Sequence, residues 1–99
     1  MKAVVIGAGP AGLAATHALM KKGADVLCLE AEEAAGGRAR GFRRDGYVFD
    51  LGAQFSADLC TTTFELCREL GMGSDMMSFD MVGAMWRDGR LYPVPVSKS

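Results

Sequence analysis

A G-x-G-x-x-G motif at residues 7–12 constrains the fold more than any other feature of the sequence, because of what lies on either side of it. The preceding run, residues 2–7, is apolar without alternation, which predicts a short parallel strand covered on both faces. The stretch from Pro10 to Lys22 is rich in Ala and Leu and predicts a helix. A second apolar run, Asp25 to Leu29, predicts another strand. We therefore expect an α/β fold with one compact right-handed βαβ unit in residues 2–30.

Between a strand and a helix, this motif predicts a turn that binds phosphates. Gly7 allows a tight turn, Gly9 lets a pyrophosphate approach the backbone, and Gly12 lets the helix pack close to the strand. The free N–H groups of the first helical turn then face the phosphates. The alternative is a turn without a ligand, but a bare turn needs one glycine rather than three. The candidate binding residues of this turn are Gly7, Gly9, Pro10, Ala11 and Gly12.

Glu30 is the candidate acceptor for a ribose. It closes the second predicted strand, 18 residues after Gly12 (30 − 12), near the offset at which a carboxylate meets the ribose of a dinucleotide. A carboxylate there accepts from the ribose hydroxyls and repels a 2′-phosphate, which favours FAD and NAD over NADP. The neighbouring Ala31 is included in the candidate site. The alternative is a solvated charge at the end of a strand.

The segment Gly36-Gly37-Arg38 distinguishes between the two remaining cofactors and favours FAD. Two glycines free the backbone to turn back towards the phosphates. Arg38, and less strongly Arg40, can supply planar donors for phosphate or flavin oxygens. The alternative is a flexible loop that carries a solvated arginine.

The rest of the chain predicts two hairpins and one helix. The first hairpin joins Phe42–Arg44 to Tyr47–Phe49 around the turn dipeptide Asp45-Gly46. A helix is expected from Thr61 to Leu70. The second hairpin is expected to join Met81–Trp86 to Leu91–Val96, with Pro93 and Pro95 confining its last strand to an edge. Residues 97–99 are expected to form a loop.

Composition excludes several classes of protein. With 99 residues the chain has room for one domain, and Lys+Arg 11 against Asp+Glu 12 gives no basic surplus for nucleic acid. Three cysteines without a C-x-x-C pair favour the reducing cytoplasm over a secreted disulfide framework, and we expect no metal site. No stretch approaches the ~20 apolar residues of a membrane span, and the apolar start is too short for a signal peptide.

Residues 3–55 resemble the N-terminus of the flavin-containing amine oxidases, protoporphyrinogen oxidases and phytoene desaturases. The glycine motif, Glu30 and Gly36-Gly37-Arg38 match the pattern of this superfamily. A further family pattern, G-x-x-x-D-x-G-A, is present as residues 46–53. The Gly-Gly segment departs from the family's R-x-G-G-R-x-x-S/T pattern, because Ala34 replaces the first Arg and Gly41 the final Ser/Thr.

The resemblance implies the N-terminal piece of a glutathione-reductase-type FAD domain. It implies a βαβ core at 2–30, a Gly-Gly-Arg loop and flavin-proximal segment at 31–55, and a helix and hairpin at 56–99. Gly52 and Ala53 are then expected to pass beside the flavin. The implied activity is hydride transfer to FAD from a small amine or a similar substrate. Members of the family are several hundred residues long, so we expect further sequence, a partner chain or self-association to complete this domain.

Other functions are compatible with the same residues. The chain could be a truncated or stand-alone nucleotide-binding module without turnover of its own. A piece of an NAD-dependent dehydrogenase is a third interpretation, which Gly36-Gly37-Arg38 and residues 50–53 make less favourable. We assign no catalytic acid, base or nucleophile within residues 1–99.

Overall fold

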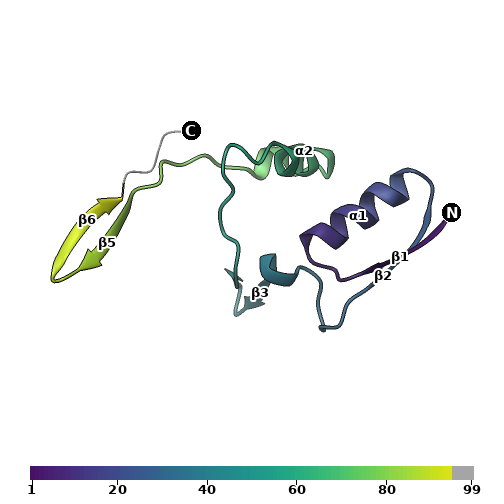
Figure 1. Ribbon diagram of the computed structural model, residues 1–99, viewed down its shortest axis with the longest axis horizontal. Coiled ribbons are helices and arrows are strands. Elements are labelled where there is room, and N and C mark those ends of the chain that lie inside the picture. The colour runs from purple at the N-terminus through teal and green to yellow at the C-terminus, as the bar shows by residue number, and fades with distance from the viewer. Residues whose placement is uncertain (95–99) are drawn as a thin grey trace. The chain divides into compact units, whose positions relative to one another are not determined.

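The computed structural model describes residues 1–94, which form two compact units that divide after Phe55 (Figure 1). The first unit contains the strands and helices β1 (Lys2–Ile6), α1 (Pro10–Lys21), β2 (Asp25–Leu29), the short 3-10 helix η1 (Gly37–Ala39), β3 (Gly41–Arg44) and β4 (Tyr47–Asp50). The second unit contains α2 (Thr61–Glu69), the 3-10 helix η2 (Gly73–Asp75), β5 (Gly83–Arg87) and β6 (Arg90–Val94). None of the helices in residues 1–94 is long and apolar enough to cross a membrane.

The first three elements form the βαβ unit that the sequence predicts. Strands β1 and β2 pair in parallel, from Lys2 opposite Asp25 to Ile6 opposite Leu29. Helix α1 contacts both strands and lies along one face of the pair (Figure 1). Pro10 occupies its first turn, where a missing N–H costs no hydrogen bond. The small side chains of this helix let it lie close to the strands. The parallel strand pair and the helix packed on it confirm the predicted α/β fold.

The opposite face of this two-stranded sheet lacks the second layer that the apolar pattern of both strands requires. Four apolar side chains point to that face and are largely exposed: Val4 at 61%, Ile6 at 85%, Leu27 at 56% and Leu29 at 47%. The reason is that the βαβ unit supplies a single helix, which covers only the other face. Among the described residues, Ala8 is the one buried apolar residue, at 5% exposure.

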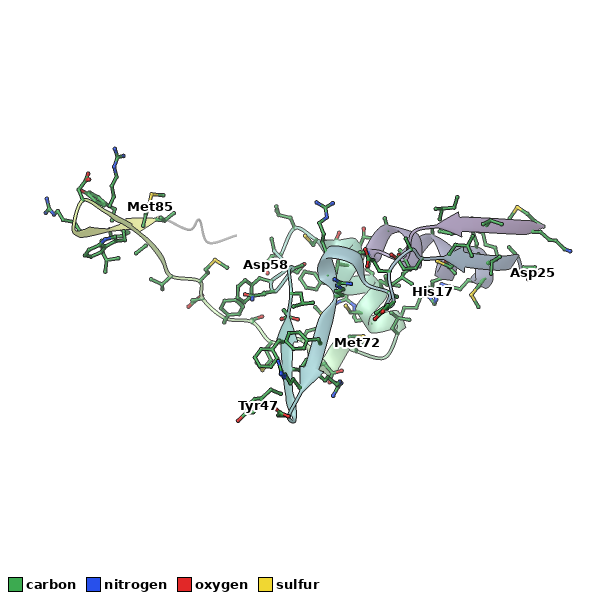
Figure 2. The ribbon with its side chains drawn as sticks, turned by 90° about the horizontal axis from the view of Figure 1, so that it is seen from below. His17, Asp25, Tyr47, Asp58, Met72 and Met85 are labelled. Atoms are coloured by element: carbon green, nitrogen blue, oxygen red, sulfur yellow. The ribbon has the colours of Figure 1, made fainter. Side chains whose placement is uncertain are left out.

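The first hairpin is built from β3 and β4, with Phe42 opposite Phe49 and Arg44 opposite Tyr47. The rings of Phe42 and Phe49 stack with their centroids 5.0 Å apart. The turn residues Asp45 and Gly46 have φ values of 51° and 81°, which suits a two-residue hairpin turn. Tyr47 lies at the turn end of this hairpin (Figure 2).

In the second unit, α2 confirms the predicted helix and ends one residue earlier than expected, at Glu69. Its partly buried face carries Phe64, Leu66 and Cys67. Strands β5 and β6 confirm the second hairpin, but β5 begins at Gly83 rather than Met81, and the turn is the dipeptide Asp88-Gly89. Met85 lies on this hairpin (Figure 2). The expectations for Pro95, Val96 and the final loop lie outside the described residues.

Candidate cofactor site

The loop between β1 and α1 turns as tightly as the glycine motif predicts. Gly7 has a φ of 98°, a conformation that side chains rarely adopt, and its N–H donates to the Leu29 carbonyl at 2.7 Å. A Cβ added to Gly12 would lie 1.8 Å from the carbonyl oxygen of Gly7. Glycine at both positions is therefore what lets the helix begin directly beneath the end of β1.

The N-terminus of α1 carries backbone N–H groups that no capping side chain accepts. Gly9 is the N-cap residue, and no side chain accepts a hydrogen bond there. Pro10 has no N–H, so Ala11 and Gly12 supply the N–H groups of the first turn, which have no acceptor within the helix. These donors and the positive end of the helix dipole suit an anion.

Glu30 lies at the end of β2 and reaches back to the glycine loop. Its Oε2 accepts the Ala8 N–H at 2.6 Å, and its Oε1 accepts the Glu32 N–H at 3.3 Å. The Ala8 hydrogen bond lowers the pKa of this carboxyl from its ordinary value of 4.5, with a smaller effect from Glu32 and a weak one from the charge of Arg40. The residue is therefore held as a carboxylate beside the N-terminus of α1, and Ala31 follows it as an exposed residue.

The Gly-Gly segment folds onto the same loop. The Gly36 N–H donates to the Ala8 carbonyl at 2.7 Å. Gly37 lies so near Gly9 that a Cβ on Gly37 would be 3.1 Å from the Gly9 Cα. Glycine loop, strand end and Gly-Gly segment, which are separate in the sequence, therefore meet at Ala8.

The segment after β4 is joined to the Gly-Gly segment through its backbone. The Ala53 N–H donates to the Arg38 carbonyl at 3.0 Å, and the Leu51 N–H donates to the Arg40 carbonyl at 3.1 Å. A Cβ on Gly52 would lie 2.0 Å from the Arg38 carbonyl oxygen. Arg38 itself is exposed in η1, and Arg40 is partly buried.

The structure thus brings together the sequence-predicted residues of all four segments. It also places Ala8, which was not predicted, at the point where the glycine loop, Glu30 and the Gly-Gly segment meet. Ala8 is not among the sequence-predicted site residues, because it occupies a variable position of the glycine motif. The available signal is its place between two glycines, where only a small side chain fits. The three cysteines are free thiols, and residues 1–94 contain no cluster of three potential metal ligands.

The donors and acceptors of this arrangement fit a dinucleotide. A Cβ on Gly9 would find only the Gly37 Cα, at 4.0 Å, so an open backbone surface is available to a pyrophosphate. Ala11 and Gly12 can donate to phosphate oxygens, and Glu30 can accept from ribose hydroxyls.

The βαβ geometry, the glycine turn and the acidic strand end define the class of Rossmann-type units. Comparison with known proteins gives the same result: the model of the NAD(P)-binding Rossmann-like domain family matches residues 5–70. The chain belongs to this family, and it corresponds to the N-terminal part of the FAD-dependent amine oxidase superfamily.

Similar proteins include several oxidases. A possible lysine-specific histone demethylase 1 of Drosophila melanogaster is 36% identical over 98% of this chain and 11% of the relative's length. Putrescine oxidase of Kocuria rosea is 41% identical over 70% of this chain and 14% of the relative's length. The solved structure of wild-type putrescine oxidase bound to putrescine matches 96% of this chain and 22% of that chain, with a TM-score of 0.67 and 28% identity. The chain therefore spans about a fifth or less of each of these proteins.

Proposed function

We propose that residues 1–55 hold the ADP half of FAD, and that the protein is a flavin-dependent oxidoreductase acting on a small amine or a similar molecule. The observation that carries this proposal is the meeting of Glu30, the glycine loop and Gly36-Gly37 at Ala8. A lone glycine motif is a weak signal, whereas its contact with an acidic strand end and a Gly-Gly segment is specific.

Each segment has a separate task in this proposal. The Ala11 and Gly12 N–H groups donate to the pyrophosphate, Glu30 accepts from the adenosine ribose, and Arg38 donates to phosphate or flavin oxygens. Gly52 and Ala53 form the wall beside the flavin. When bound, FAD would accept a hydride from a C–H bond of the substrate, so that the adjoining C–N or C–C single bond becomes a double bond, and O₂ or another acceptor would reoxidise the flavin.

The absorption spectrum of the purified full-length protein tests the proposal. We expect the two visible bands of a bound flavin, and we expect them to bleach when an amine such as putrescine is added without oxygen. A flavin that no amine bleaches would contradict the proposed substrate class. A protein that binds NAD and holds no flavin would contradict the cofactor assignment and support a dehydrogenase instead.

A further inference from the structure

We propose that Glu30 is a positioning residue as well as a ribose acceptor, because its Oε2 holds the glycine loop and the Gly36-Gly37 turn in the binding arrangement before any dinucleotide arrives. This inference rests on the proposed function for its ligand, but its structural basis does not require a ligand.

The two oxygens of the Glu30 carboxylate have unequal partners. Oε2 accepts the Ala8 N–H at 2.6 Å, a short distance typical of a strong charge-assisted hydrogen bond. Oε1 accepts the Glu32 N–H at 3.3 Å, in an exposed position. The hydrogen bond to Oε1 is long and easily exchanged. Oε1 can therefore accept a hydrogen bond from a ribose hydroxyl while Oε2 continues to accept the Ala8 N–H.

Ala8 connects Glu30 to the Gly36-Gly37 turn through its backbone hydrogen bonds. Its side chain is 5% exposed, and both polar groups of its backbone are used. The N–H donates to Glu30, and the carbonyl accepts the Gly36 N–H at 2.7 Å. Without the carboxylate, the N–H of a buried residue loses its acceptor, and leaving such a donor unpaired is costly. We therefore expect the loop and the turn to loosen together.

Two nucleotides separate positioning from ribose binding. ADP presents both ribose hydroxyls, whereas 2′,3′-dideoxy-ADP presents none and cannot hydrogen-bond to Glu30 through its ribose. We would titrate each nucleotide by calorimetry into the flavin-free full-length protein, as wild type, Glu30→Ala and Glu30→Gln. Glu33→Ala is the matched control, because it removes an exposed carboxylate from the same segment.

We expect Glu30→Ala to weaken dideoxy-ADP binding about tenfold, the usual effect of losing one well-formed hydrogen bond. Glu30→Gln should recover most of this loss, because its carboxamide oxygen can accept the Ala8 N–H. Glu33→Ala should bind as the wild type does. If Glu30→Ala weakens ADP binding and leaves dideoxy-ADP binding unchanged, Glu30 acts on the ribose alone and the proposal is wrong.

Amide hydrogen exchange in the ligand-free protein decides the matter independently of any nucleotide. Glu30→Ala should speed exchange at Ala8 and Gly36 about tenfold or more and leave the middle of α1 unchanged. Should that variant fail to fold, Glu30→Met keeps a side chain of similar length without an acceptor. Unchanged exchange at Ala8 and Gly36 would overturn the positioning role. A wild-type protein that binds neither nucleotide would overturn the proposed function instead, while exchange still tests the positioning role.

Discussion

Gly9 and Gly12 lie three residues apart in one motif, yet the structure gives them different tolerances for a side chain. Gly9 has a φ of −74°, which any residue can adopt, and a Cβ there would meet only the Gly37 Cα, at an ordinary contact distance of 4.0 Å. Gly12 faces the Gly7 carbonyl oxygen, which a Cβ would approach to 1.8 Å. Gly9 is therefore compatible with a ligand-binding role, whereas Gly12 is required by the fold itself.

Gly12→Ala should therefore destabilise the protein by more than about 3 kcal/mol, above the usual cost of overpacking, because the new Cβ meets a backbone carbonyl that cannot turn aside, although alanine is the better helix former. Gly9→Ala is the matched control and should leave the free energy of unfolding nearly unchanged. Urea denaturation of both variants in the flavin-free form measures the difference. Equal stabilities would mean that α1 does not approach β1 as closely as described.

Glu30 should make stability depend on pH. Its pKa is lower in the folded protein than its ordinary value of 4.5, chiefly because of the Ala8 N–H. A carboxyl of this kind stabilises the fold above its unfolded pKa, and the contribution is lost as pH falls through the folded pKa. Thermal melts of the wild type and Glu30→Gln between about pH 7 and pH 3 should therefore converge as pH falls. A difference that stays constant or widens towards acid pH would contradict the assignment.

At the level of the elements, the β3–β4 hairpin and the Gly-Gly segment behave as one piece. Their backbones are joined through Arg38 and Ala53, and Gly52 leaves room for the Arg38 carbonyl. The far end of the same hairpin, at Gly46, has open space around it and a φ of 81°. A disturbance at Gly52 is therefore expected to reach the site, and one at Gly46 is not.

Gly52→Ala should displace the Arg38 carbonyl and reduce the flavin content of the full-length protein severalfold. Gly46→Ala is the control: it strains the turn by about 1–2 kcal/mol and should keep the flavin. The ratio of flavin absorbance to protein absorbance measures both. Flavin loss in the Gly46 variant, or full retention in the Gly52 variant, would place the cofactor elsewhere.

Local signals in the sequence predicted these elements well. Pro10 marks the start of α1, and Asp45-Gly46 marks the first hairpin turn, because each favours a particular backbone conformation. The role of Ala8 could not be predicted, because its bond to Glu30 joins residues 22 positions apart and depends on the register of β1 against β2. The exposed sheet face agrees with the expectation that more than these residues is needed to complete the domain, since strands that are apolar on both faces require a layer on each.

For the molecule as a whole, the exposed face of β1 and β2 is the dominant feature of residues 1–55. Val4 and Ile6 on one strand and Leu27 and Leu29 on the other form a continuous apolar surface. A two-stranded sheet with one covered face is marginally stable in water, and its free edges are templates for other strands. The relatives named above are several times longer than this chain, which leaves ample sequence to cover such a face.

The isolated 99-residue chain should therefore self-associate, melt without a sharp transition and hold FAD poorly. Sedimentation velocity and calorimetric melting of the isolated chain measure these properties. We propose that further sequence completes this domain, and a protein that contains residues 1–99 together with such sequence is the reference, which should melt cooperatively. A cooperative monomer of 99 residues that binds FAD tightly would show that residues 1–99 need no further layer.

The flavin content of full-length Gly9→Val shows whether the glycine motif binds the pyrophosphate of FAD. A branched side chain at Gly9 occupies the backbone surface where the pyrophosphate is proposed to lie, and a Cβ there meets no atom of β1 within 4 Å. We expect equimolar FAD in the wild type and almost none in the variant, with unchanged circular dichroism. Full flavin content in Gly9→Val would contradict pyrophosphate binding at residues 7–12, because the glycine motif would then be only a turn.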